Sequence, residues 1–158
     1  MRSLEPALNL RRAAYSDTCL LYQWANNPVV RSQAFSSQPI SWFDHIHWCH
    51  SRIARCNTIW IAEKQSCAVG QVRFDLRDNR LWVDIHLDEN CRGKGLGLHL
   101  LERAIALQSA ITPGYCFCAQ VKIVNSASCR LFVKAGFVLV GLHQVQGQWC
   151  WQFERFNL

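Results

Sequence analysis

The chain has 158 residues, half of them hydrophobic, which predicts one domain spanning residues 1–158 around a single sizeable core. It contains no run of about 18 apolar residues, so we expect no membrane span, and the first twelve residues lack the apolar segment of a signal peptide. The formal net charge of +6 comes from scattered Lys and Arg residues, which favours phosphorylated small molecules over nucleic acid as ligands.

Nine cysteines are many for this length, but their odd count and their place inside expected strands and helices argue against a disulfide framework. Cys116 and Cys118 would point to one face of a strand, and there is no Cys-x-x-Cys pair for zinc. We therefore expect reduced, buried thiols in a cytoplasmic protein.

The first half of the chain predicts one strand followed by helices. Ser16 or Asp17 can cap a helix, Pro28 can begin the next, and Ser41 with Asp44 resembles a capping box for a longer one. The apolar patterns place these elements at residues 8–13 (strand), 18–25, 29–33 and 42–55 (helices), and then 59–62 and 69–76 (strands joined by a turn at 64–67).

The stretch at residues 81–107 carries the strongest signal. Residues 81–88 alternate apolar and polar side chains, which predicts a strand entered through a hairpin turn at 77–79. A loop with three glycines, Arg92-Gly93-Lys94-Gly95-Leu96-Gly97, then leads into an apolar run with helical spacing. Free N–H groups and the positive dipole end of a helix, approached through glycines, suit a pyrophosphate. The loop therefore predicts an anion site.

The last part of the chain predicts a strand, a helix and a hairpin. After a break at 112–114, the strand covers 115–121, the helix covers 125–135 and ends at Gly136, and the hairpin strands cover 137–145 and 148–156. The resulting order is β-αα-βββ-α-β-α-ββ.

Two motifs carry a resemblance to a known family. The pattern Arg92-x-x-Gly95-x-Gly97 resembles the acetyl-CoA signature of the GNAT superfamily of N-acetyltransferases, and residues 125–137 resemble its N-x-x-S-x-x-L-[YF]-x-K-x-G-F helix at the expected distance downstream. The resemblance implies an α+β GNAT fold, with a central mixed, mostly antiparallel sheet. Its central strand and the strand at 115–121 would run parallel and splay apart.

In that fold the pantetheine arm of acetyl-CoA lies between the splayed strands, and the glycine loop holds the pyrophosphate. Asn125 matches an asparagine that reaches the cofactor near the pantetheine. The resemblance thus implies a cofactor site made of Ile85, His86, Leu87, Arg92, Gly93, Lys94, Gly95, Leu96, Gly97, Asn125 and Lys134.

A second resemblance narrows the substrate. Residues 24–48 and 70–75 are similar to bacterial acetyltransferases of nucleotide-sugar pathways, including enzymes that acetylate the 4-amino group of UDP-linked amino sugars. It implies Arg31, His45 and Arg73 as substrate-binding residues. Ribosomal-protein and aminoacyl acetyltransferases share parts of the pattern, so a protein N-terminus or an aminoacyl conjugate is an alternative acceptor. A non-catalytic CoA-binding module is an alternative of another class.

The implied reaction is attack of a neutral amine on a thioester carbonyl, which needs donors for an oxyanion and a route for the amine proton. The resemblance implies the backbone N–H of Leu87 as the oxyanion donor. Phe132 stands where many members have a tyrosine acid, and Gln120 stands where others have a glutamate base. The remaining base candidates lie on the polar face of the central strand: Asp84, His86 and Asp88. Asp84 or His86 is expected to relay the proton: His86 has an ordinary pKa of about 6.5, whereas burial would have to raise the pKa of Asp84. The alternative is that both only position the amino sugar or a water.

Several aromatic and histidine residues have a simpler interpretation. Trp24, Trp42 and Trp48 have helical spacing, which favours core packing over stacking on a sugar. His47 and His50 could bind a metal, but no third ligand is evident, so we expect none. The expected partner is a small-molecule amine, and the protein is expected to be a monomer or a homodimer.

Overall fold

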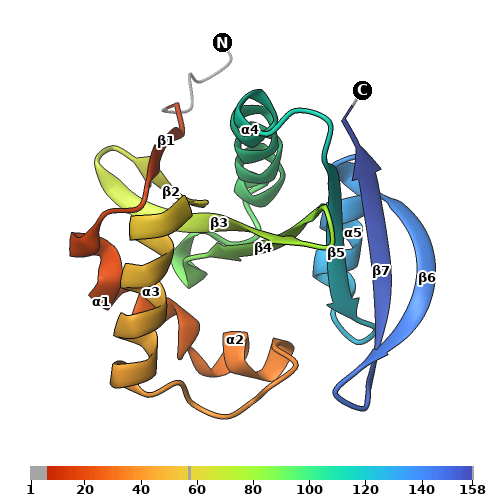
Figure 1. The fold of residues 1–158 in the computed structure, drawn as a ribbon, viewed down its shortest axis with the longest axis horizontal. Helices are drawn as coiled ribbons and strands as arrows, with labels where there is room; N and C mark the ends of the chain where they lie inside the picture. The colour runs from red at the N-terminus through yellow and green to blue at the C-terminus, as the bar shows by residue number, and fades with distance from the viewer. Residues whose placement is uncertain (1–6, 57, 158) are drawn as a thin grey trace.

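The computed structural model describes residues 7–56 and 58–157, which form one seven-stranded sheet in the order β1-β2-β3-β4-β5-β7-β6 (Figure 1). Only β4 and β5 pair in parallel, so the expected mixed, mostly antiparallel sheet is confirmed. The strands are β1 (Asn9–Arg12), β2 (Ile59–Lys64), β3 (Cys67–Arg77), β4 (Arg80–Leu87), β5 (Cys116–Lys122), β6 (Val138–Val145) and β7 (Gln148–Phe156).

The helices lie close to the predicted ranges, with the short α2 as a third helix before β2 that the expected order did not count. Two single 3-10 turns were also not anticipated from the sequence. The helical elements are η1 (Tyr15–Asp17), α1 (Thr18–Ala25), α2 (Pro28–Gln33), α3 (Trp42–Cys56), η2 (Glu89–Cys91), α4 (Leu96–Ile111) and α5 (Ser126–Lys134). No helix in the described part of the chain is long and apolar enough to cross a membrane. All nine cysteines are free thiols.

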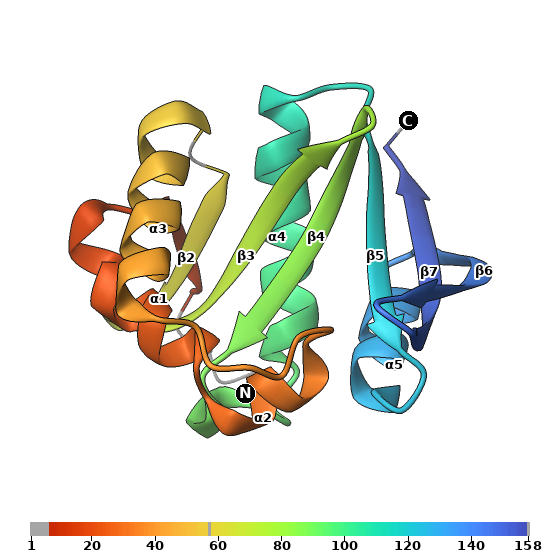
Figure 2. The same ribbon diagram turned by 60° about the horizontal axis from the view of Figure 1, so that its bottom comes forward.

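β4 and β5 pair only at one end. The parallel register joins Arg80 to Cys116, Leu81 to Phe117 and Trp82 to Cys118, and then stops. Beyond that point residues 83–87 of β4 pair with β3 alone, while β5 continues beside β7. Figure 2 shows the two strands diverging, with α2 across the wide end. The predicted splay is confirmed, and it leaves one edge of β4 without a neighbouring strand.

Two apolar clusters lie on opposite faces of the sheet. On one face α4 buries a stripe of side chains with helical spacing, each no more than 1% exposed: Leu100, Leu101, Ala104 and Ile105. This stripe packs on the apolar residues of β3, β4 and β5 and on Phe132 and Phe137 of the α5 region. On the other face α1 and α3 cover β2 through a smaller cluster around Leu21, Trp24, Cys49 and Ile59.

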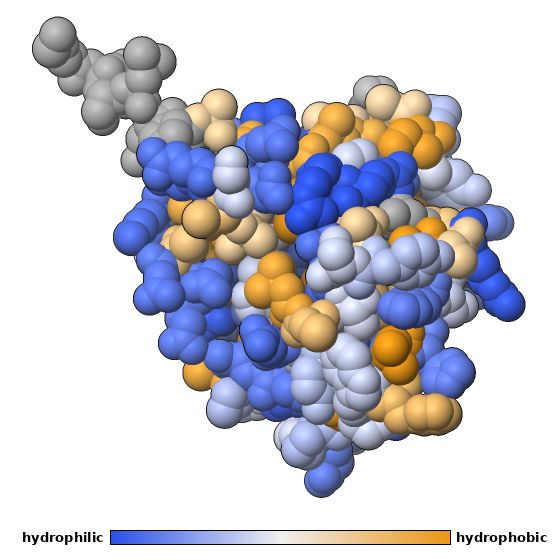
Figure 3. Space-filling view, turned by 90° about the vertical axis from the view of Figure 1, so that its left-hand side faces the viewer, coloured by the Kyte–Doolittle hydropathy of each residue, from blue (hydrophilic) through white to orange (hydrophobic). Residues whose placement is uncertain are grey.

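The tryptophans do not all join the core. Trp24 is buried, as expected, but Trp42 and Trp48 are 42% and 36% exposed, so the core-packing prediction is wrong for these two. α3 buries His45 and Cys49 instead, which leaves the two indoles beside the helix contact. The outer side of α1 and α3 accordingly mixes apolar and polar residues without one continuous apolar patch (Figure 3).

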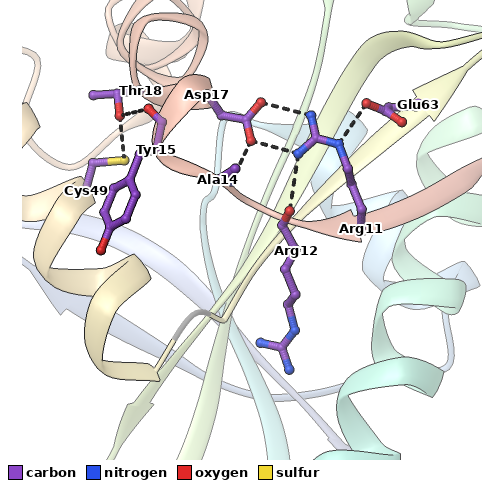
Figure 4. Close-up of polar contacts among 8 residues, drawn as sticks. All are labelled: Arg11, Arg12, Ala14, Tyr15, Asp17, Thr18, Cys49 and Glu63. Carbon is purple, nitrogen blue, oxygen red and sulfur yellow. Dashed lines mark hydrogen bonds and ion pairs between the residues drawn. The ribbon is translucent and has the colours of Figure 1, made fainter.

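A charged network ties β1 to η1 and β2 (Figure 4). The guanidinium of Arg11 donates to both carboxylate oxygens of Asp17, at 2.8 and 2.9 Å, and to Glu63 at 2.8 Å. Asp17 also accepts from the backbone N–H of Ala14. Asp17 does precede α1, but its carboxylate does not cap that helix, because the network already uses its oxygens.

This network makes the stability of the fold pH-dependent. Burial by itself would raise the pKa of Asp17. The hydrogen bonds from Arg11 and Ala14 and the charge of Arg11 outweigh burial, so the pKa lies below its ordinary value. A carboxyl group with a depressed pKa stabilises the folded state above its unfolded pKa of about 3.9, and this stabilisation is lost as the pH falls. We expect Asp17→Asn to lower the free energy of unfolding by about 1–3 kcal/mol at pH 7.

Denaturant unfolding of the parent and Asp17→Asn between pH 3 and pH 8 checks this prediction. The gap between the two proteins should shrink as the pH falls towards and below about 4. The control is Asp78→Asn in the exposed turn between β3 and β4, which should follow the parent at every pH. A gap that is constant with pH would contradict the role of the ionised carboxylate.

Candidate active site

The glycine loop forms an open cradle at the start of α4. Gly93 and Gly95 have φ values of +73° and +76°, and a Cβ at either position would meet nothing within 4 Å. Gly95 is the residue before α4 and gives no side-chain cap to the first N–H groups of the helix. At Gly97, a Cβ would lie 3.3 Å from Leu87 Cδ1, so the missing side chain lets α4 approach β4.

Two cations flank this cradle. Arg92 donates through Nε to the carbonyl oxygen of Leu87 at 3.0 Å, and Lys94 donates to that of Asn90 at 3.0 Å. Neither pairs with a carboxylate within the described residues, so both keep their net positive charge. Glycine backbone, uncapped helix N–H groups and two cations suit the pyrophosphate of coenzyme A.

The free edge of β4 presents alternate backbone groups to the gap. The N–H of Asp88 donates to Val69 of β3, so in this antiparallel pair the residues with even numbers face β3. The backbone groups of Val83, Ile85 and Leu87 therefore face the gap. These gap-facing backbone groups agree with the expectation that residues 85 and 87 pair with the pantetheine arm. The prediction of a backbone contact from His86 is wrong, because its N–H and C=O face β3.

Asn125 and Lys134 lie at opposite ends of α5. Asn125 caps the helix, with Oδ1 accepting from the N–H of Ser128 at 3.2 Å. It follows the last residue of β5 closely, so it borders the wide end of the gap. Lys134 is exposed in the last turn, roughly 13 Å along the helix from Asn125. Leu131, one turn before Lys134, packs close to Gly97, so this end of α5 lies beside the start of α4.

His86 projects from β4 on the side opposite α4. Its side chain is 9% exposed, packs 5.1 Å from the ring of Trp24, and has a buried Nε2 without a hydrogen-bond partner. Burial lowers the pKa of His86 to about 4, the charge of Arg92 lowers it too, and Asp84 and Asp88 oppose the shift only partly. The imidazole is therefore neutral at pH 7 and is a weak proton acceptor there.

Asp84 lies on the same side as His86 but in a different setting. Its side chain is 53% exposed, with Arg73 Nη1 3.7 Å and Gln71 Nε2 3.5 Å from Oδ2. The burial that the relay hypothesis requires of Asp84 is not present. The exposed carboxylate can instead accept a hydrogen bond from an amine that enters beside β4.

A loop that contains α2 crosses the wide end of the gap. Asn26 closes its base by exchanging two hydrogen bonds with the backbone of Ile40. At its far side Lys122 donates to the carbonyl of Ser32 at 3.0 Å and Gln148 donates to that of Phe35 at 2.7 Å. Within the loop, Arg31 donates to the carbonyls of Ser36 and Gln38. A shallow hollow of about 260 Å³ lies beside these contacts, lined by Lys122, Ile123, Val124, Gln148 and Trp149.

His45 does not reach the site. It is 2% exposed, and its Nε2 lies 2.9 Å from the carbonyl oxygen of Thr18, so it joins α3 to α1. Burial lowers the pKa of His45, which keeps the ring neutral. The expectation that His45 binds substrate does not fit this position. His50 lies 3.2 Å from the Thr18 hydroxyl, and the described residues hold no group of three side chains that could bind a metal.

The two positions that depart from the familiar motifs are also structural. Phe132 is 3% exposed and packs against Phe137 and Phe153. Gln120 donates to the side chain of Gln152. Neither group titrates, so neither supplies an acid or a base.

Sequence reasoning missed the contacts that depend on register. Trp24 donates through Nε1 to Asp88 at 3.3 Å and so fixes α1 against the end of β4. Arg52 of α3 forms an ion pair with Asp75, which also binds Arg73. The sequence shows that Arg73 and Asp75 share one face of a strand. It does not show that Arg52 of α3 and Asp84 of β4 lie opposite them.

Comparisons with known proteins agree with this geometry. A family model described as "Acetyltransferase (GNAT) family" matches residues 20–137. The Bacillus subtilis protein YwnH, which carries a provisional name as a phosphinothricin acetyltransferase, is 27% identical over 85% of this chain and 86% of its own.

Solved structures share the fold at lower identity. Spermidine N-acetyltransferase from Vibrio cholerae, in complex with CoA and spermine, has a TM-score of 0.80 at 20% identity, over 94% of this chain and 95% of its own. Ribosomal-protein-alanine N-acetyltransferase from Brucella melitensis has a TM-score of 0.81 at 19% identity, over 94% and 99%.

The cradle can be tested at Gly95. An alanine there would be strained by roughly 1–2 kcal/mol in the left-handed conformation, which weakens the grip of the loop on a diphosphate. We expect Gly95→Ala to raise the Kd for coenzyme A roughly five- to thirty-fold in a calorimetric titration. Gly114→Ala, at φ +82° in the turn before β5, imposes the same strain elsewhere and should leave the Kd unchanged. Equal Kd values for the two variants would contradict the assignment.

The state of His86 can be observed directly. Because burial holds its pKa at about 4, the imidazole should show the NMR signals of a neutral ring from pH 8 down to about pH 5. A histidine in the unfolded chain should instead titrate near pH 6.5, and this provides the reference. A midpoint above pH 6 for His86 in the folded protein would show that the ring is more hydrated than described.

Proposed function

Because the chain belongs to the GNAT family of acetyltransferases, it is an acetyl-CoA-dependent N-acetyltransferase that acts on an amine, and we propose that its acceptor is the primary amine of a nucleotide-linked amino sugar. Such an acceptor combines an amine with a negatively charged diphosphate. We further propose that the enzyme acts in the cytoplasm, where acetyl-CoA and nucleotide sugars occur.

The cofactor fits residues from three elements. The N–H groups of the loop at 93–97, with Arg92 and Lys94, would hold the diphosphate. The gap-facing N–H and C=O of Ile85 would hold the pantetheine, because the Leu87 carbonyl already accepts from Arg92. Asn125 can donate through its amide nitrogen, because its oxygen already caps α5. When bound, acetyl-CoA supplies an activated acetyl group as a thioester.

Three residues of β4 would serve the transfer. The N–H of Leu87 faces the gap and can donate to an oxygen that gains negative charge, while Asp84 orients the amine from the acceptor side. His86 is neutral and buried at the end of the same face, and its free Nε2 can hold a water or the amine by a hydrogen bond. Because His86 is neutral at pH 7 and the side chain of Asp84 is exposed, the amine proton would leave through water.

One observation carries the nucleotide part of the proposal. Arg31 and Lys122 are held by backbone carbonyl oxygens, and neither has a carboxylate partner among the described residues. Both lie where the α2 loop crosses the wide end of the gap. Two uncompensated cations on the acceptor side favour an anionic acceptor over a polyamine.

A panel of acceptors tests the proposal. With acetyl-CoA and a free-thiol assay, kcat/KM should be at least about tenfold higher for a UDP-linked 4-amino sugar than for spermidine, phosphinothricin or a ribosomal-protein N-terminal peptide, as expected for one well-placed charged contact. The variant Arg31→Gln/Lys122→Gln should raise the KM for the UDP-linked sugar and leave unchanged the KM for the same amino sugar without its nucleotide.

Lys64→Gln is the matched control, because it removes a cation at the end of β2, a strand that β3 and β4 separate from the gap. Equal turnover of the amino sugar with and without its nucleotide would contradict the anionic part of the acceptor. A higher kcat/KM for the peptide than for the UDP-linked sugar would show that the acceptor is a protein N-terminus.

A further inference from the structure

Four charged side chains form an alternating row across the acceptor face. Arg52 of α3 pairs with Asp75, Asp75 accepts from Arg73 Nε at 3.2 Å, and Arg73 Nη1 lies 3.7 Å from Asp84. The row crosses α3, β3 and β4, so it depends on the tertiary fold. It ends at Asp84, the only member whose side chain is more than half exposed.

Arg73 is the fixed point of this row. Its guanidinium lies 5.0 Å from the ring of Trp48, while its side chain is 26% exposed. The carboxylate of Asp75 fixes Nε, and the indole covers the planar face. On another side Trp48 approaches His45, with ring centroids 5.9 Å apart. The indole is therefore placed to hold the arginine, which explains why a tryptophan beside the site is only partly buried.

The position of Arg73 creates a balance of charge at Asp84. A lone exposed carboxylate would attract an amine in its ammonium form, and an ammonium has no lone pair with which to attack a carbonyl. A guanidinium beside the carboxylate offsets the negative charge. The row as a whole carries no net charge, with two guanidinium and two carboxylate groups. An amine at Asp84 can then be hydrogen-bonded and still lose its proton.

We propose that Arg73, held by Trp48 and Asp75, is a positioning residue that orients the Asp84 carboxylate and offsets its charge, so that the acceptor amine is held in its neutral, reactive form. This inference rests on the proposed role of Asp84 in amine binding. It does not depend on the identity of the molecule that carries the amine.

The other groups around Asp84 do not cancel this effect. His86 is uncharged at neutral pH, and Gln71, whose Nε2 lies 3.5 Å from Asp84 Oδ2, carries no charge. Asp88, two residues beyond His86, accepts a hydrogen bond from Trp24 Nε1. Arg73 of β3 is the charged group beside Asp84, with Asp75 of β3 and Arg52 of α3 behind it in the row. Asp84, Asp88 and Arg92 are the charged groups that act on the neighbouring His86.

The test compares two amines that differ in charge. 2-Aminoethanol is an ammonium ion at neutral pH, whereas hydroxylamine is uncharged. With both substrates saturating, Arg73→Gln should move the rising limb of kcat for 2-aminoethanol to higher pH by about one unit, because Asp84 then holds the bound amine more firmly in its ammonium form. The same variant should leave the pH profile for hydroxylamine in place.

Further variants separate positioning from charge. Arg73→Lys keeps the positive charge, so its pH profile should stay close to that of the parent. Its KM should be higher, because an ammonium lacks the planar N–H groups with which the guanidinium binds Asp75 and orients Asp84. Trp48→Leu should move the 2-aminoethanol profile to higher pH by less than Arg73→Gln does. Trp48→Phe keeps an aromatic face over Arg73, so its profile should match that of the parent. The control is Arg77→Gln, which removes a guanidinium stacked 4.8 Å from Trp82 at the far end of β3 and should change neither profile.

Each outcome decides between the proposals. Unchanged profiles for Arg73→Gln, or equal shifts for both amines, would overturn the charge balance and leave a structural role for Arg73. A shift with 2-aminoethanol, combined with no reaction of the UDP-linked sugar, would refute the sugar acceptor and support the role of Arg73. Absence of turnover with every amine would overturn both.

Discussion

The divergence of β4 from β5 is the constraint on which the site depends. A strand inside a sheet normally satisfies its N–H and C=O groups on both sides, and leaving buried groups unpaired costs free energy. Here the pairing stops at Trp82, and the backbone of Val83, Ile85 and Leu87 faces the gap. The fold tolerates this because α4 and α5 pack against the apolar side chains of the same strands. The open edge becomes useful when an extended ligand supplies the missing partners.

The alternation of β4 then separates two tasks. Leu87 and Ile85 point their side chains into the cluster under α4, while their backbone groups face the gap. Asp84 and His86 point their side chains to the opposite face and give their backbone groups to β3. Under the proposed function, one strand would serve the cofactor with its main chain and the acceptor with its side chains. A one-residue slip in register would exchange these roles, so the strong pairing of β3 with β4 protects the chemistry as well as the fold.

Local signals in the sequence were sufficient for most of the elements and for the cofactor loop. Gly95 at the start of α4 and Gly136 after α5 have roles set by their neighbours in the chain, and the structure agrees with both. Asn125, expected inside the last helix, instead caps it. The acceptor face was harder to predict because it combines α1, α3, β3 and β4. His45 matched a substrate-binding motif, but its side chain is buried and contacts the carbonyl of Thr18, which joins α3 to α1. Asp17 was a candidate cap for α1, but its carboxylate binds Arg11 instead. Tertiary partners decided both cases.

The two titratable residues beside the gap argue for catalysis by position rather than by a strong base. His86 is too buried to hold a proton at neutral pH, and the side chain of Asp84 is 53% exposed rather than buried. A thiolate with an ordinary pKa of about 8.5 is a fair leaving group, so the absence of an acid at Phe132 costs little. What remains difficult is to bring a neutral amine to the carbonyl in the right direction, and effective concentrations can supply about 7–11 kcal/mol of such a barrier. In the proposal above, the row from Arg52 to Asp84 would set that direction, because Asp75 and Trp48 hold Arg73 in place.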